Sequence, residues 1–140
     1  AGEARGWSAG ATDDKTWRTM DSCVDTWSGL GLDKYFGHAW YRATVRLPAV
    51  PAGRKTYLWI SASDGALSAW FNGQPLTFTN RKAETTPAFN GYAEPTSVEI
   101  THLLKPNATN TVVFRVNRTG VINELGTGGL LGPVSIYREK

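Results

Sequence analysis

Residues with specialised chemistry are scarce in this chain of 140 amino acids, which has one Cys, one Met and two His. The lone cysteine, Cys23, excludes an intrachain disulfide, and a buried, inert thiol is the expected state. His38 and His102 have no second histidine or cysteine at the spacing of a metal site, and the aspartates do not form a calcium loop of alternating oxygen ligands. We therefore expect no metal and no other cofactor.

The chain also lacks a cluster of charges of one sign and a long apolar run. The 15 basic and 12 acidic residues give a net charge of +3 and are spread along the chain, whereas a phosphate backbone is bound by clustered cations. No apolar run approaches the roughly 20 residues that cross a bilayer. We therefore expect neither nucleic acid nor membrane as a partner. The chain begins Ala-Gly-Glu, without an initiating Met or a signal peptide, so we expect a piece of a longer protein.

Catalytic motifs are missing as well. No Gly-x-Ser-x-Gly elbow occurs. The glycines from Gly126 to Gly132 lack the Lys-Ser/Thr of a phosphate loop, which favours tight turns there. Glycoside hydrolysis needs two facing carboxylates, and Glu84, Glu94 and Glu124 lie on or beside candidate loops. Because small sandwich domains carry loop carboxylates routinely, a free-standing hydrolase is the least favoured alternative.

Alternating apolar and polar residues are what the chain has in abundance. Leu58 and Ile60, for example, alternate with Tyr57 and Trp59, as in a strand with one buried face. The pattern predicts six strands: 41–47, 57–63, 67–71, 96–101, 111–117 and 134–138. At this length one domain, residues 1–140, is expected, with a core that needs no disulfide or metal. The fold class is therefore all-β, an antiparallel β-sandwich.

Turn chemistry punctuates these strands. Asn72-Gly73 is a strong hairpin signal because both residues tolerate positive φ, and Asp64-Gly65 is expected to reverse the chain after the second strand. Helix is nearly absent. Short turns at residues 13–17 and 101–104 are the only helical candidates.

Several short motifs occur in an order that covers nearly the whole chain. They are Thr12-Asp13-Asp14-Lys15-Thr16-Trp17-Arg18, Ala39-Trp40-Tyr41-Arg42, Ser63-Asp64-Gly65, Ala69-Trp70-Phe71-Asn72-Gly73, Thr101-His102-Leu103-Leu104-Lys105-Pro106 and Gly128-Gly129-Leu130-Leu131-Gly132-Pro133-Val134. In this order the chain resembles the galactose-binding-like jelly-roll domain that precedes the catalytic barrel in glycoside hydrolase family 2 and is also attached to other polysaccharide-degrading enzymes. The resemblance implies a jelly-roll sandwich and a helper domain, because the barrel with the family's catalytic carboxylates is absent from these residues.

The chain departs from the family pattern at two positions. Leu131 stands where the family commonly has Trp, so an aromatic contribution from that loop is missing. His102 stands where the family usually has Asp, which alters the cap of a short turn.

Three long loops, residues 28–39, 77–95 and 118–133, are the expected place of function. A sugar site needs an aromatic platform for the apolar ring face and polar side chains for the hydroxyls, and these loops contain both. The platform candidates are Tyr35, Phe36, Phe89 and Tyr92. The hydrogen-bonding candidates are His38, Asn80, Arg81, Glu84, Asn90, Arg118, Asn123 and Glu124.

The six tryptophans divide into two groups. Trp17, Trp27, Trp40 and Trp70 fall on positions that the resemblance makes structural. Trp59 lies with Tyr57 on the face opposite Leu58 and Ile60, where it is a flat sugar platform or a docking patch, unless a loop covers it.

We therefore expect a non-catalytic carbohydrate-binding module that guides a polysaccharide-active enzyme to its glycan, with an oligo- or polysaccharide and the catalytic domain of the parent enzyme as partners. The alternative is a structural domain that supports the catalytic barrel without binding sugar, in which Trp59 and the basic face of Arg42 and Arg46 form the interface. A secreted, periplasmic or cell-surface bacterial location is expected.

Overall fold

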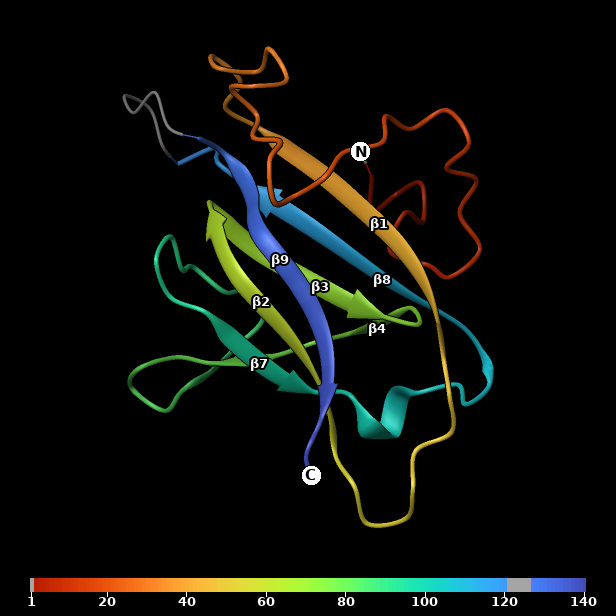
Figure 1. Cartoon of the computed structure of the whole chain (residues 1–140). Helices are drawn as coiled ribbons and strands as arrows, with labels where there is room; N and C mark the ends of the chain where they lie inside the picture. Colours follow the sequence, from red (N-terminus) through yellow and green to blue (C-terminus); the bar gives the residue numbers. More distant parts are fainter. Residues whose placement is uncertain (1, 121–126) are drawn as a thin grey trace.

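The computed structural model describes residues 2–120 and 127–140, and its longer strands form two facing sheets (Figure 1). One sheet has the order β1-β8-β3-β4, and the other has the order β7-β2-β9. Every neighbouring pair is antiparallel. The bounds are β1 His38–Leu47, β2 Thr56–Asp64, β3 Ala66–Phe71, β4 Gln74–Pro75, β7 Thr96–Glu99, β8 Ala108–Asn117 and β9 Gly129–Arg138. The predicted antiparallel β-sandwich is confirmed.

The six predicted strands are all present, and most of them extend beyond the residues that the alternating pattern predicted. The pattern missed three two-residue strands, β4, β5 (Phe78–Thr79) and β6 (Thr85–Thr86), because so short a segment carries no alternation. Of the two helical candidates, residues 101–104 contain the 3₁₀ turn η1 (Thr101–Leu103), whereas residues 13–17 form turns only.

The core lies between the two sheets and is filled from one face of each strand. Leu58 and Ile60 of β2 and Val116 of β8 have no exposed surface, and Phe114 is 3% exposed. Burial of a side chain of this size stabilises a fold by about 1.5–3 kcal/mol. Leu58 and Ile60 of β2 thus face the core, as predicted.

The turn signals act in two different ways. Asn72 and Gly73 have φ of 51° and 83°, and they join β3 to β4 in the predicted hairpin. Asp64-Gly65 also reverses the chain, but it carries the chain from β2 in one sheet to β3 in the other. Alternation and turn residues do not reveal this difference, because Asp-Gly and Asn-Gly are both signals for a local reversal of the chain.

The glycine-rich stretch differs from its prediction. Residues from Gly129 onward belong to β9, so the predicted loop 118–133 is too long, and these glycines do not form tight turns. Gly132, at φ 74°, and Pro133 oppose the single residue Ser61 of β2 in a β-bulge. A bulge accommodates both a positive φ and a proline without an amide hydrogen, which explains this pair inside a strand.

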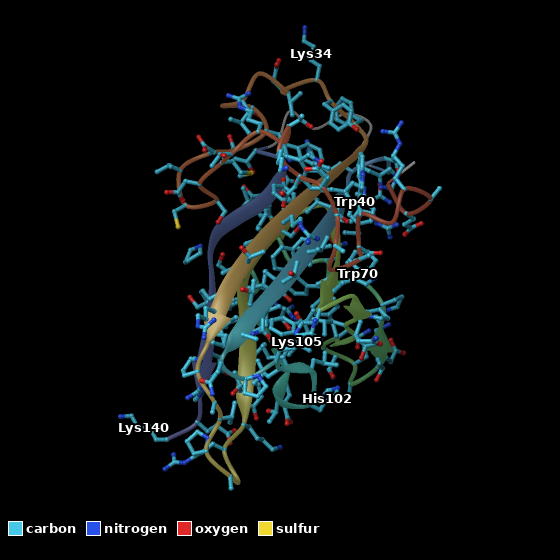
Figure 2. The ribbon with its side chains drawn as sticks, turned by 90° about the vertical axis from the view of Figure 1, so that its right-hand side faces the viewer. Lys34, Trp40, Trp70, His102, Lys105 and Lys140 are labelled. Atoms are coloured by element: carbon cyan, nitrogen blue, oxygen red, sulfur yellow. The ribbon has the colours of Figure 1, made fainter. Side chains whose placement is uncertain are left out.

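An N-terminal segment, residues 2–20, covers part of the outer face of the β1-β8-β3 sheet. Trp40 and Trp70, which are labelled in Figure 2, project from that face. Their rings stack with centroids 5.4 Å apart. Trp7 of the segment lies edge-on to Trp40 at 6.0 Å and to Trp17 at 5.2 Å. Trp27 is the tryptophan in the core, whereas Trp17, Trp40 and Trp70 are half-buried in this second cluster.

Arg42 fastens the same segment to the sheet. Its guanidinium pairs with Asp14 at 3.0 Å and donates to the backbone oxygens of Ala9 and Gly10. The side chain is 4% exposed. The predicted basic face is therefore wrong for Arg42, because the segment covers it, and only Arg46 is exposed. Cys23 also differs from expectation, since its thiol is exposed.

Candidate functional site

A pocket of about 570 Å³ opens beside the sandwich, where residues 76–95 connect β4 to β7. We call it the side pocket. It brings together four of the predicted hydrogen-bonding residues, Asn80, Arg81, Glu84 and Asn90, with the platform candidate Phe89. The sequence did not predict that these four residues line one cavity, because their positions depend on how residues 76–95 fold back on themselves.

The β5–β6 hairpin forms one wall of the side pocket. At its tip, the Asn80 carboxamide oxygen accepts from the backbone N–H of Lys82 at 2.9 Å and of Glu84 at 3.0 Å. The Asn80 amide nitrogen donates to the Glu84 carboxylate at 2.8 Å. Ala83 has φ 61°, which the tight tip requires. Asn80 thus organises the turn and fixes the direction of the Glu84 carboxylate.

An ion pair joins this wall to the opposite one. The Arg81 guanidinium contacts the carboxylate of Glu94, which precedes β7 in the chain. Both side chains are accessible to solvent, 82% and 44% exposed, so the pair contributes at most about 1 kcal/mol to stability. Its main effect is geometric, because it holds two parts of the connection at a defined separation.

Aromatic rings lie beneath these polar side chains. Phe78 is 2% exposed, and its ring centroid is 5.8 Å from that of Phe89. Phe89 is partly buried against the core, and both rings line the pocket. The side pocket therefore combines an apolar floor with charged and amide groups at its edge.

The floor is tied to the sandwich by backbone hydrogen bonds. Phe89 and Leu67 exchange two N–H···O bonds of 2.7 Å, which extends the β3 edge by one bridge. Two residues later, the Gly91 carbonyl accepts from the Ser63 N–H of β2 at 3.0 Å. The connection is thus anchored to both sheets.

A second group of predicted residues lies at the His38 end, the end of the sandwich where β1 begins and β2 finishes. Tyr35 is 40% exposed, packs its ring 5.4 Å from Trp27, and donates its hydroxyl to the His38 carbonyl at 2.9 Å. His38 is exposed and begins β1, so it belongs to a strand and not to the predicted loop. Figure 2 shows this end near Lys34, opposite to His102.

Arg118 differs from the expected open-loop residue. Its side chain is 1% exposed and pairs with Asp64 at 3.3 Å. The guanidinium also lies 5.7 Å from the Phe36 ring and 6.0 Å from the Trp27 ring. Arg118 is therefore a buried organiser of the His38 end, and Phe36 packs over it.

Two further aromatic candidates lie outside the side pocket. Tyr92 is 65% exposed and does not line the side pocket. Trp59 is half-buried on the outer face of the β7-β2-β9 sheet, paired in register with Ser97 and Ser135. Asn123 and Glu124 lie outside the described residues.

Sequence reasoning left several side-pocket residues out of the ligand set. Lys82, Thr86, Glu94 and Thr96 line the pocket beside the four predicted residues. The opposite charges of Arg81 and Glu94 could have indicated an ion pair. The two residues are separated by 13 positions in a loop without a periodic pattern, so the sequence does not show that they lie close together. Among residues 2–120 and 127–140, no group of three or more His, Cys, Asp or Glu side chains could hold a metal ion. No helix in the described part of the chain has the length and apolarity to span a membrane.

Comparison with known proteins gives a structural match and no sequence match. No family model and no curated protein matches the chain. The solved β-glucuronidase from Ruminococcus gnavus matches with a TM-score of 0.60 and 22% identity, over 84% of this chain and 18% of that one. Its complex with D-glucaro-d-lactam gives 0.62 and 22%, over 83% and 18%. Its complex with D-glucuronic acid gives 0.57 and 21%, over 84% and 19%.

This chain therefore spans less than a fifth of the length of the solved enzymes that it matches. At such identity the match shows a shared fold. The expected relationship to glycoside hydrolases stays a prediction, because what the match shows is a fold shared with part of a solved β-glucuronidase.

Proposed function

We propose that this chain is a non-catalytic accessory domain of a larger glycan-active enzyme, and that it holds an oligosaccharide in the side pocket. The observation that carries the proposal is the composition of that pocket. Asn90, Lys82 and the fixed Glu84 carboxylate offer hydrogen-bonding groups in a pocket that the partly exposed ring of Phe89 also lines. This is the combination that a pyranose requires.

The dimensions of the side pocket support the same proposal. Its volume of about 570 Å³ lies within the range of about 300–1,000 Å³ typical of small-molecule sites. The site is open and wet, so ordering a ligand there offsets much of the gain from contact, and affinity near millimolar to micromolar is expected.

The side pocket does not support hydrolysis. The general acid of a glycosidase lies in an apolar environment, whereas Glu94 is 44% exposed and paired with Arg81. Glu84 accepts a hydrogen bond from Asn80. Both carboxylates have roles in the geometry of the pocket, and turnover by the isolated chain is not expected.

The test is calorimetric titration with a panel of soluble oligosaccharides, repeated on two variants. Asn90→Ala removes an exposed side chain of the side pocket, and we expect affinity to fall about 5- to 20-fold, the value of one or two hydrogen bonds. Trp59→Ala serves as the matched control on the other side of the β2 strand. Absence of binding to every glycan, with unchanged circular dichroism and melting temperature, contradicts the proposal.

The second candidate function, a structural domain that supports a catalytic barrel, rests on the outer face of the β7-β2-β9 sheet. Tyr57 and Tyr137 stack there at 5.2 Å, Tyr137 is 43% exposed, and Trp59 belongs to the same face. Arg42 and Arg46 cannot belong to this interface, because they project from the outer face of the opposite sheet. Loss of assembly with the parent enzyme in Trp59→Ala, with glycan binding unchanged, supports this candidate.

A further inference from the structure

The tripeptide Phe-Asn-Gly occurs twice in the chain, at residues 71–73 and at residues 89–91. An asparagine followed by glycine is chemically labile, because the backbone nitrogen of a residue without a side chain can approach the asparagine carboxamide closely. The two copies share the reactive pair and the residue before it. A difference in their reactivity in the folded chain is therefore a property of the fold.

The first copy is held in the β3–β4 hairpin. The Asn72 amide donates to the Leu103 carbonyl and to the Asn110 side-chain oxygen, both at 2.8 Å. The Asn72 side-chain oxygen accepts from the Thr111 N–H at 2.9 Å. The carboxamide therefore cannot turn toward the nitrogen of Gly73 without breaking three hydrogen bonds.

The second copy lacks such restraints. Asn90 is exposed and lines the side pocket, and its carboxamide has no hydrogen-bond partner among residues 2–120 and 127–140. The same holds for the peptide group that joins Asn90 to Gly91. The two groups that react with each other, the Asn90 carboxamide and the Gly91 N–H, are thus not engaged by other parts of the described chain.

The packing of the side pocket requires glycine at position 91. A Cβ there would overlap the ring of Phe89 and lie 2.7 Å from the Glu94 carbonyl oxygen. A side chain that would slow the reaction at Asn90 is therefore excluded by the same contacts that form the pocket.

We propose that Asn90 is a site of spontaneous deamidation, which places a third carboxylate in the side pocket beside Glu84 and Glu94. The Gly91 nitrogen loses its proton and forms a bond to the Asn90 carboxamide carbon, and the amide nitrogen leaves as ammonia. Water then opens the cyclic imide at either of its carbonyls, which gives aspartate or isoaspartate. Water is the only other reactant.

The product differs from asparagine in two ways that affect the side pocket. An amide donor is replaced by an acceptor. In isoaspartate the backbone also gains a methylene group between two anchored residues, since Phe89 bonds to Leu67 at 2.7 Å and the Gly91 carbonyl accepts from Ser63 at 3.0 Å. On the proposed function, on which this consequence rests, oligosaccharide affinity falls about 5-fold, the value of one hydrogen bond.

The experiment compares the two copies within the folded full chain. After incubation at neutral and mildly basic pH, the peptides that contain Asn72 and Asn90 are quantified by mass spectrometry and by isoaspartate methylation. Asn90 is expected to react about 100-fold faster, because the reaction at Asn72 first breaks three hydrogen bonds. Its rate is expected to rise with pH, since the attacking nitrogen has to lose a proton.

The chain unfolded in guanidinium chloride is the control, because the two copies are then expected to react at similar rates. Equal rates at Asn72 and Asn90 in the folded chain overturn the proposal. A preference for Asn90 that persists undiminished in the unfolded chain also overturns it, since local sequence and not the fold is then the cause.

Asn90→Gln tests the consequence for binding, because glutamine keeps the carboxamide but has to close a larger ring. An oligosaccharide that binds the fresh chain is titrated into fresh and aged samples, and each protein is compared with its own fresh sample. The affinity of the unmodified sequence is expected to fall in step with the modification of Asn90, while that of Asn90→Gln stays constant. Equal loss in both proteins overturns the proposed consequence. If no oligosaccharide binds the fresh chain, the proposed function fails, whereas deamidation of Asn90 is decided by mass spectrometry alone.

Discussion

Asn110 is the residue whose replacement tests the structure most directly. Its side chain has no exposed surface and lies where η1 and the following turn meet the β3–β4 hairpin. Its amide donates to the carbonyls of Lys105 at 2.9 Å and Ala108 at 3.0 Å. Its oxygen accepts from the Lys105 N–H and from the Asn72 amide, both at 2.8 Å.

Asn110→Ala removes all four of these hydrogen bonds and leaves their partners, the Lys105 and Ala108 backbone and the Asn72 amide, partly buried. At about 1 kcal/mol for each bond, the free energy of unfolding falls by about 4 kcal/mol. For a chain of this length, 1 kcal/mol corresponds to about 3 °C in Tm, so the midpoint falls by about 12 °C. Asn110→Asp keeps the size but turns a donor into a charged acceptor that faces two carbonyl oxygens, and is expected to lose at least as much.

Urea and thermal unfolding, followed by circular dichroism and tryptophan fluorescence, measure this loss. Asn90→Ala is the control because it removes the same chemical group from an exposed position, and a change within about 0.5 kcal/mol is expected. A loss of less than about 1 kcal/mol for Asn110→Ala refutes the argument, since it means that water replaces the network at little cost.

Three further changes test other parts of the fold. Arg42→Ala releases the N-terminal segment, with a loss of about 2–4 kcal/mol and faster proteolysis within residues 2–20, whereas Arg46→Ala leaves both unchanged. Asp64→Ala removes the ion pair at the His38 end and two hydrogen bonds to its carboxylate, and unfolding is expected to become about 3–5 kcal/mol easier. The hydrogen bond to Glu139 raises the pKa of Tyr57 from 10.0 to about 12, so its stabilising contribution is complete below pH 10 and is lost between about pH 10 and 12. Glu139→Gln should move the tyrosinate absorbance transition back toward pH 10, and an unchanged transition contradicts the assignment.

The strands and the hairpin were predictable because their signals are local. Alternation along β2 and β8 reports directly which face is buried, and Asn72-Gly73 needs a backbone conformation that few other residues adopt. The same reasoning identified Asn80, Arg81, Glu84 and Asn90 as polar residues of one long connection. It did not reveal that the polar atoms of Asn80 form hydrogen bonds within the turn, to Lys82 and Glu84. Those bonds depend on how residues 80–84 fold back, which the alternation of apolar and polar residues does not encode.

Other features depend on contacts between distant segments. Arg118 was expected on an open loop, but it is buried because Asp64, 54 positions earlier, lies beside it at the His38 end. Arg42 was expected at an interface, but residues 9–14 cover it. In both cases the sequence predicts that a charged side chain in a strand or loop is exposed to solvent. Burial becomes favourable only because a partner from a distant part of the chain forms an ion pair with it.

The sequence by itself determined the layers of this protein, since which residues face inward is written in the two-residue period of each strand. The tertiary structure decided which polar residues share a cavity and which are buried partners of one another. The physical reason is that burial along a strand depends on neighbours two positions away, whereas the side pocket depends on the fold-back of a twenty-residue connection anchored to both sheets.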